Sequence, residues 1–200
     1  FFYRDYGTWD SDSFVDFHVQ IKSPPSLRRW VRPQANFYFD QLNPFKPLPV
    51  DQAFAMLEWG LNWCIATTSY QFLIIHAAVV AKNNKAIILP GEPGAGKSTL
   101  CAALVTRGWR LLSDEMALVN LDDLRITPVP RPIGLKNDSI DIMQRFDGQA
   151  VIGPSVADTV KGTVAHMRPP SDSIAHENCS ASAKCIIFPN YSAGTETRTK

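Results

Sequence analysis

The sequence has 200 residues, of which 45% are hydrophobic, so it can bury a sizeable core within one globular domain, and disorder of the whole chain is excluded. Twenty basic residues stand against nineteen acidic ones without a basic stripe interleaved with aromatic residues, so nucleic acid is not an expected partner. The apolar runs are far shorter than the roughly 20 residues that span a bilayer, so no membrane contact is expected either.

The cellular compartment follows from the N-terminus and the cysteines. The first residues carry acids and show no small-residue cleavage site, and the four cysteines show no paired spacing. Both features favour a cytoplasmic protein with reduced thiols. Whether the chain forms a homo-oligomer is left open.

Residues 1–50 are expected to form a β-rich lead-in. Apolar and polar residues alternate over 14–21, which predicts a half-buried strand, and residues 35–49 predict a second strand, a turn and an extended exit limited by prolines. Asp51 is then predicted to cap a helix over 52–66. One face of this helix is apolar, while two tryptophans lie on another, so we expect it to pack on two sides.

Two core strands are expected next, over 71–81 and 85–89. The segment Lys82-Asn83-Asn84 joins them, and asparagine tolerates the positive φ that a tight hairpin needs. Beyond residue 98, the spacing of Leu100, Ala103 and Leu104 predicts a helix that ends at Gly108. Residues 109–115 predict a strand that delivers acids at its carboxyl end. From residue 128 onward, prolines separate short strands and loops, and residues 184–191 predict a last strand.

The segment 91–98, Gly-Glu-Pro-Gly-Ala-Gly-Lys-Ser, matches the pattern G-x-x-x-x-G-K-[ST] at every defined position. In such a loop the backbone N–H groups surround phosphate oxygens, and the following helix adds its partial positive charge. Lys97 is expected to reach the β and γ phosphates of ATP, and the Ser98 hydroxyl to complete the shell of a Mg²⁺ ion. The expected nucleotide-binding residues are Gly91, Glu92, Pro93, Gly94, Ala95, Gly96, Lys97, Ser98 and Thr99.

Asp114 and Glu115 follow the loop after one helix and one short strand. Ligands gather at the carboxyl ends of the strands of a parallel sheet, so both acids are expected beside the loop, one holding Mg²⁺ and the other accepting a proton. Adjacent strand residues point to opposite faces, so the sequence leaves open which acid has which role. His76 lies in an apolar strand and, by composition alone, is more typical of the core than of a catalytic site.

The segment 76–119 resembles the HPr kinase/phosphorylase superfamily, whose P-loop fold is shared with phosphoenolpyruvate carboxykinase. The resemblance rests on the strand histidine, the loop, the pair Arg107-Gly108 and the acid pair. The segments "LEWGLNWCIA", "GWRLLSDE", "PRPIGLKNDSI" and "KGTVAHMRPP" are similar to the HPr kinase-related kinase A group. The resemblance implies an α/β P-loop kinase domain over residues 51–200. It assigns the catalytic base to Asp114, the metal to Ser98 with Glu115, and a position near the phosphate to His76.

The chain also departs from the HPr kinases. Asp114-Glu115 stands where two aspartates are usual, and the segment around Arg131 lacks the family's glutamate. HPr itself is therefore not assumed as substrate. The expected function is transfer of the γ-phosphoryl group of ATP to a serine of a protein or peptide. The alternatives are a small-molecule hydroxyl kinase and a non-catalytic, nucleotide-gated binding or assembly protein.

Further candidate residues lie in the second half of the chain. Arg131, which we include among the catalytic residues, and Lys136 are expected to clamp the transferring phosphate unless they are solvated charges. Lys161, Thr163 and His166 are candidates for the acceptor side. No evident basic set for a di-acid substrate appears, which disfavours a carboxykinase-like enzyme. His176, Cys179 and Cys185 lack a fourth ligand, which disfavours zinc.

Overall fold

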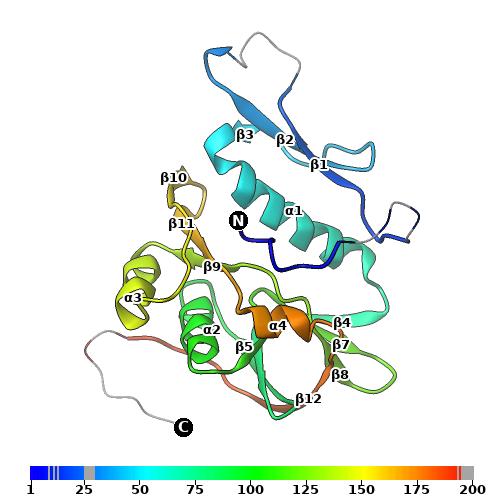
Figure 1. Ribbon diagram of the computed structural model, residues 1–200, viewed down its shortest axis with the longest axis vertical. Helices are drawn as coiled ribbons and strands as arrows, with labels where there is room; N and C mark the ends of the chain where they lie inside the picture. The colour runs from blue at the N-terminus through cyan, green and yellow to red at the C-terminus, as the bar shows by residue number, and fades with distance from the viewer. Residues whose placement is uncertain (9, 11, 13, 25–29, 193, 195–200) are drawn as a thin grey trace.

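The computed structural model describes residues 1–8, 10, 12, 14–24, 30–192 and 194. Over these residues the chain is a strand-rich, mixed α/β protein with a mixed six-stranded sheet, two three-stranded sheets and four α-helices. The first sheet and the long helix α1 form the upper part of the molecule in Figure 1, and the six-stranded sheet lies below them. Residues 195–200, the end of the expected kinase region, lie outside the described residues.

The lead-in is an antiparallel sheet of β1 (Val19–Lys22), β2 (Gln34–Phe39) and β3 (Leu48–Pro49). The strand predicted over 14–21 begins later than expected, at Val19. Strand β2 ends at Phe39, because Asp40 turns the chain with a φ of 52°, so β1 finds a partner only from Val19 onward. A strand exists only where its ladder can be formed, and the alternating pattern does not report where the partner ends.

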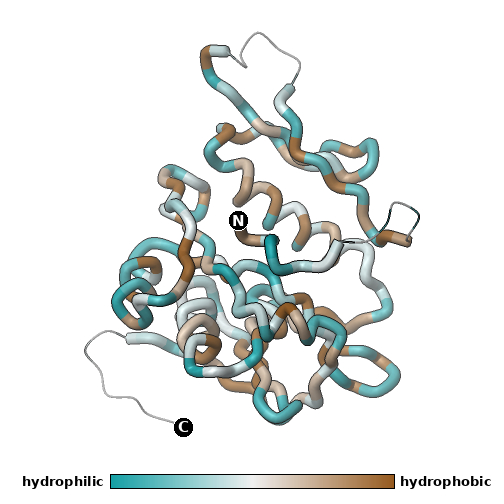
Figure 2. Tube along the Cα trace, viewed as in Figure 1, coloured by the Kyte–Doolittle hydropathy of each residue, from teal (hydrophilic) through white to brown (hydrophobic). Residues whose placement is uncertain are grey.

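Helix α1 (Ala53–Thr68) follows a 3₁₀ turn, Val50–Gln52. The predicted cap at Asp51 was wrong, because this residue lies inside the 3₁₀ turn and Gln52 is the N-cap without a side-chain hydrogen bond. Packing on two sides is confirmed. Met56 and Cys64 pack with Phe37 of the lead-in sheet, whereas Ile65 packs with strand residues of the lower sheet. Apolar stretches, brown in Figure 2, recur along α1 and in the sheet below it.

The six-stranded sheet has the order β5-β12-β8-β7-β4-β6, and β4 also pairs with β5, so the pairing closes the sheet on itself. Its strands are β4 (Phe72–Lys82), β5 (Lys85–Pro90), β6 (Arg110–Ser113), β7 (Met116–Asn120), β8 (Arg125–Thr127) and β12 (Ala181–Ile186). The predicted tight hairpin is confirmed, since Asn83 and Asn84 both have positive φ between β4 and β5.

The expected parallel sheet was wrong. Only β5 and β12 pair in parallel among the described strands, and the other pairings of this sheet are antiparallel. Links of a few residues explain the antiparallel pairs β4–β5 and β7–β8, because such links can join only antiparallel neighbours. The last strand also ends earlier than predicted, at Ile186 rather than at residue 191.

The second layer contains the antiparallel sheet β10-β11-β9 and the remaining helices. Its elements are α2 (Lys97–Thr106), β9 (Ile133–Lys136), α3 (Asp138–Phe146), β10 (Val156–Thr159), β11 (Gly162–Met167) and α4 (Ser171–Ala175). Helices α3 and α4 were missed, because the prolines around them were interpreted as marking only strands and loops. Both lie between these prolines.

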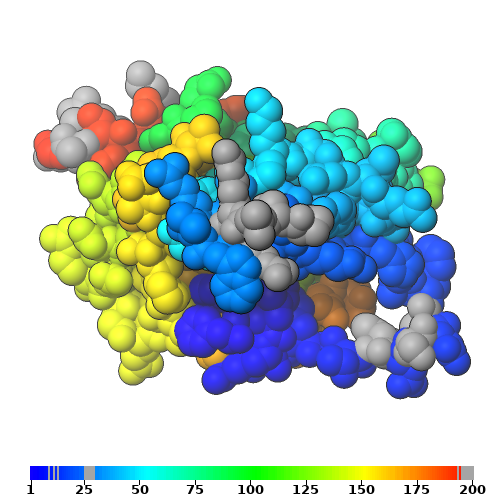
Figure 3. All heavy atoms as spheres, turned by 90° about the horizontal axis from the view of Figure 1, so that it is seen from above, coloured from blue at the N-terminus to red at the C-terminus, as the bar shows by residue number. Residues whose placement is uncertain are grey.

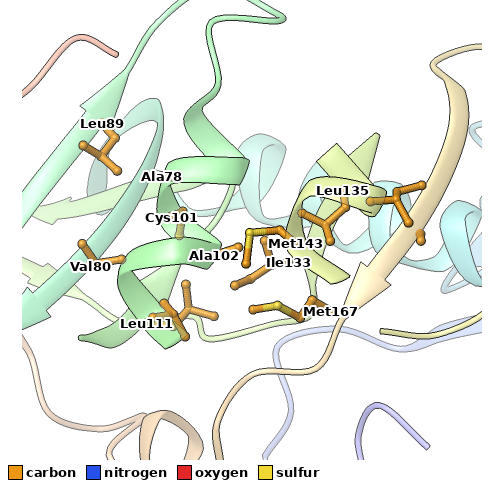
Figure 4. Close-up of a cluster of buried hydrophobic side chains, with 13 residues drawn as sticks. Ala78, Val80, Leu89, Cys101, Ala102, Leu111, Ile133, Leu135, Met143 and Met167 are labelled. Atoms are coloured by element: carbon orange, nitrogen blue, oxygen red, sulfur yellow. The ribbon is translucent and has the colours of Figure 1, made fainter. Parts of the chain in front are cut away.

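Helix α2 is packed between the six-stranded sheet on one side and β9, β11 and α3 on the other. The helix predicted from the spacing of Leu100, Ala103 and Leu104 is confirmed as α2, which ends at Thr106, shortly before Gly108. Leu100, Ala103 and Leu104 are only partly buried, while the buried face is Cys101, Ala102 and Val105. Small side chains face the core because α2 has neighbours on both sides. Figure 4 shows Cys101 and Ala102 between the strand residues Ala78 and Val80 on one side and Ile133 and Met143 on the other.

The described helices contain none with both the length and the apolar character that crossing a membrane requires. All four cysteines are free thiols, with Cys64 and Cys101 buried and Cys179 and Cys185 exposed.

Candidate functional site

The glycine-rich loop connects β5, which ends at Pro90, to α2, which begins at Lys97. Gly96 is the N-cap of α2 with a φ of 92°, a left-handed conformation that glycine adopts without steric cost. No side chain caps the helix, so its first N–H groups have no side-chain acceptor. A helix N-terminus in this state binds phosphate well, because its N–H groups and its dipole both favour an anion.

Lys97 lies over this loop. Its Nζ donates hydrogen bonds to the carbonyl oxygens of Gly91 at 2.6 Å and Glu92 at 3.2 Å. The ion pairs found among the described residues do not include Lys97. Two neutral carbonyl groups therefore hold a charge that no carboxylate neutralises, which is the electrostatic situation a phosphate group requires.

The acid pair lies where β6 passes into β7 along one edge of β4. The Ser113 hydroxyl accepts hydrogen bonds from the N–H groups of Glu115 and Met116, at 3.3 and 3.1 Å. The Ala77 N–H donates to the Glu115 carbonyl at 3.2 Å, so hydrogen bonding to β4 continues through the two residues between β6 and β7. These hydrogen bonds place the two carboxylates in different surroundings.

Asp114 is buried, with 9% of its surface exposed, and its Oδ2 accepts a hydrogen bond from the Gly134 N–H at 2.8 Å. Burial raises the pKa of Asp114 to about 6, against the lowering effects of the Gly134 amide, the Ser98 hydroxyl and the Lys136 charge. The nearby Glu115 charge contributes to this raised pKa. The second oxygen, Oδ1, is buried without a hydrogen-bond partner. Such an atom costs free energy unless a ligand contacts it.

Glu115 is more exposed than Asp114 and lies beside His76. Its Oε1 lies 3.8 Å from Nδ1 of His76, and both side chains are partly open to solvent, with 57% of His76 and 33% of Glu115 exposed. His76 is therefore not the core residue that composition alone favours, because β4 presents this side chain outward beside the acid pair. Asp114 thus lies beside Ser98 and Glu115, and Glu115 lies beside His76.

A small pocket, with a cavity volume of about 40 Å³, lies against the two acids. Helix α1, strands β9 and β11 and the turn before β11 complete its wall. Its lining residues are Glu58, Trp59, Asn62, Ser113, Asp114, Glu115, Val129, Arg131, Pro132, Gly134, Lys136, Lys161, Val164 and His166. Lys136, Lys161 and His166, proposed from the sequence for this neighbourhood, thus share one pocket. A basic set that was not evident in the sequence exists here.

His166 is neutral in this setting. Burial, together with the charges of Arg131 and Lys136, lowers its pKa to about 4. The rings of Phe2 and Phe54 lie edge-on to the imidazole at 6.1 and 4.9 Å. Its surroundings therefore suit a packed, uncharged wall of the pocket.

Arg131 borders the same pocket, but its guanidinium is already engaged. Nη1 lies 3.3 Å from Oε2 of Glu58, and Nη2 donates to the Asn62 side chain. Burial raises the pKa of Glu58, while Arg131 and the Tyr3 hydroxyl lower it, and Tyr3 donates a hydrogen bond to the same carboxylate. These contacts support a structural link from Arg131 to α1 and do not support the phosphate clamp expected from the sequence.

The donor atoms around the loop suit Mg²⁺. Ser98, Asp114 and Glu115 offer oxygen ligands, which this ion prefers, and the unpartnered Oδ1 of Asp114 fits a ligand role. Within the described part of the chain, no three His, Cys, Asp or Glu side chains gather closely enough to hold a metal by themselves. A Mg²⁺ ion here would therefore take its other ligands from water and phosphate, as is usual for nucleotide-bound magnesium.

Three pocket residues come from α1 and were not predicted as site residues: Glu58, Trp59 and Asn62. One signal was present in the sequence, because Glu58 is the only charged residue in an otherwise apolar helix. A charge inside such a pattern needs a buried partner. Which partner it has could not be derived, since Arg131 lies 73 residues away.

Comparison of the chain with models of protein families, with curated proteins and with solved structures finds no significant match.

Proposed function

We propose that this protein is a kinase that transfers the γ-phosphoryl group of Mg·ATP to a hydroxyl group. The observation that carries the proposal is the placement of Asp114. A buried carboxylate with one unpartnered oxygen lies beside Ser98, the second residue of the helix that follows the glycine-rich loop. A group that abstracts a proton in phosphoryl transfer needs this position and a pKa near the working pH.

The residues would divide the work as follows. The loop amides and Lys97 hold the phosphates, and Ser98 with Glu115 holds Mg²⁺, which offsets the negative charge on the phosphates when bound. Asp114 accepts the proton of the acceptor hydroxyl. The hydroxyl oxygen forms a bond to the γ phosphorus while the bond from that phosphorus to the β–γ bridging oxygen breaks, and ADP leaves. His76, near Glu115, is available to orient that carboxylate.

The proposed acceptor is a serine of a protein or peptide, on the basis of the sequence resemblance to HPr kinase-related proteins. A small-molecule hydroxyl is the second choice.

The decisive experiment measures ATP binding and single-turnover loss of γ-phosphate on matched variants. Lys97→Ala should lose ATP affinity while its melting temperature stays near that of the wild type, because its side chain contacts only loop carbonyls. Lys85→Ala, at the other end of β5, is the control and should change neither quantity.

The acid pair separates a kinase from a nucleotide-gated switch. Asp114→Asn should bind ATP as well as the wild type or better, while transfer falls by roughly 10² to 10⁴. Glu115→Gln should lose affinity and Mg²⁺ dependence together. If both variants bind ATP normally and transfer at near wild-type rates, the proposed mechanism is wrong.

A further inference from the structure

Two lysines at the pocket beside the acid pair form no close ion pair with a carboxylate of the described residues. Lys136 is the last residue of β9, Lys161 lies in the turn between β10 and β11, and both line the pocket with Asp114 and Glu115. Burial and the Lys136 charge lower the pKa of Lys161, and Glu115 opposes this only in part. An anion bound between them would relieve the repulsion of the two like charges.

The position of Lys161 is built by its turn. The Thr159 hydroxyl donates to the Gly162 carbonyl at 2.6 Å and accepts from the Lys161 N–H at 3.1 Å. Gly162 has a φ of 83°, and a Cβ there would come within 2.5 Å of Oδ1 of Asn137. That same oxygen accepts a hydrogen bond from the Thr163 N–H at 3.1 Å, so the turn is locked against the end of β9.

Contacts with the helices α1 and α3 also fix the positions of the two lysines. The Lys161 Nζ lies 5.1 Å from the centre of the Trp59 ring on α1, a cation–π contact that supports the ammonium group without neutralising it. The Lys136 backbone N–H donates to the Ser139 hydroxyl at 2.7 Å, which fixes the end of β9 against α3.

Arg131 provides the contrast inside the same pocket. Its charge has a buried carboxylate partner, Glu58, at 3.3 Å. Of the three cationic side chains that line this pocket, Arg131 has a close carboxylate partner, whereas Lys136 and Lys161 are available to a ligand.

We propose that the phosphoryl acceptor carries an anionic group, a carboxylate or a phosphate, which Lys136 and Lys161 bind while its hydroxyl group meets Asp114. This inference rests on the proposed kinase function. The lysines select the acceptor and take no part in bond making, so the proton still goes to Asp114 and the phosphoryl group to the hydroxyl oxygen.

The test uses two pairs of probes that differ in one charge. N-acetylserine and N-acetylserinamide represent small acceptors, and the capped peptides Ac-Ala-Ser-Asp-Ala-NH₂ and Ac-Ala-Ser-Asn-Ala-NH₂ represent protein segments. Binding of each probe is measured by ligand-observed NMR in the presence of Mg²⁺ and a non-hydrolysable ATP analogue, and again without nucleotide. The binding readout does not require turnover.

In at least one pair, the anionic probe should bind about tenfold more tightly than its neutral partner, as expected for charge-assisted hydrogen bonds. Lys136→Gln and Lys161→Gln should each reduce this preference by about threefold or more, since exposed charges are screened by solvent. Lys82→Gln is the matched control, because Lys82 also lies over a tryptophan, Trp109, at 5.8 Å, but outside the pocket. It should leave the preference unchanged.

The outcomes separate this inference from the proposed function. Preference in the first pair identifies a small anionic acceptor, and preference in the second identifies an acidic protein segment. Equal binding within both pairs, or a preference that survives both lysine substitutions, overturns the anion site even if ATP is bound and hydrolysed. If the protein binds no ATP but keeps a lysine-dependent preference for an anion, the kinase proposal fails and the anion site stands.

Discussion

Asp114 carries a charge that its surroundings do not fully compensate. The Gly134 amide satisfies one oxygen, but the other has no partner, and burial keeps the pKa near 6. An ordinary surface aspartate has a pKa near 3.8 and is a weak base. The environment of Asp114 therefore improves it as a base at the expense of folded stability, a combination common at functional sites.

The pH dependence of stability follows with a definite sign. Because the pKa of Asp114 is raised from 3.8 to about 6, the folded protein holds a proton that the unfolded chain has lost, and the free energy of unfolding falls as pH rises between these values. Asp114→Asn should therefore be more stable than the wild type at pH 7, by on the order of 1 to 3 kcal/mol. Below pH 3.8 this advantage should disappear.

Urea unfolding of both proteins at several pH values measures this difference directly. In the wild type, phosphoryl transfer should increase as pH rises through 6, since the base must be deprotonated. A variant that is less stable than the wild type at pH 7 would show that the carboxylate is better compensated than its contacts indicate.

Helix α1 connects the lead-in sheet to the pocket. It packs on β2 through Met56 and Cys64, which contact Phe37, and another face of the same turns carries Trp59 and Asn62 into the pocket wall. The close approach to β2 depends on Gly60, because a Cβ there would lie 2.2 Å from the Phe37 ring, which is fully buried. A helix of this length usually avoids glycine, so steric need explains its presence.

Gly60→Ala should destabilise the protein by about 1 to 3 kcal/mol, since overpacking at a ring that cannot move outweighs the better helix propensity of alanine. The melting temperature should fall by several degrees, roughly 2 to 4 °C per kcal/mol for a chain of this size. Gly148→Ala, where a Cβ has no neighbour within 4 Å, is the control and should change little. Equal melting temperatures for both variants would mean that β2 can shift away from α1.

At the scale of the whole molecule, one buried network joins segments that are far apart in the sequence. Glu58 on α1 meets Arg131 ahead of β9 and Tyr3 of the N-terminal segment. Asp5 of that segment accepts a hydrogen bond from Ser171 at the start of α4. Figure 3 shows the dark blue N-terminal atoms against the yellow and orange second layer. The pocket wall therefore depends on contacts from three parts of the chain.

Removal of one partner from this network should lower the free energy of unfolding. Arg131→Met leaves Glu58 buried without its cation, which should lower the free energy of unfolding by about 3 to 5 kcal/mol. The double variant Arg131→Met with Glu58→Met should recover much of the loss, because no unpaired charge remains. Arg145→Met, an exposed helix arginine, is the control. Urea unfolding distinguishes the cases, and a single variant as stable as the wild type would contradict the proposed structural role of Arg131.

Local features of the sequence predicted local features of the fold. The two asparagines at 83 and 84 predicted a tight hairpin, because few residues tolerate positive φ, and the spacing of glycines, Lys97 and Ser98 predicted a loop between a strand and a helix. Such signals depend on backbone conformation within a few residues. The position of Asp114 beside Ser98 also agrees with the sequence, since one short helix and one strand return the chain to the loop.

The tertiary structure decided everything that required knowledge of a distant partner. Sheet direction depends on which strands meet, and the partners of β12 lie about 55 to 100 residues before it. The meeting of Arg131 with Glu58, and of Lys136 with Lys161 in one pocket, has the same cause. A sequence specifies the charge of each side chain, but only packing decides which charges are paired, because pairing acts over a few ångströms in space and not along the chain.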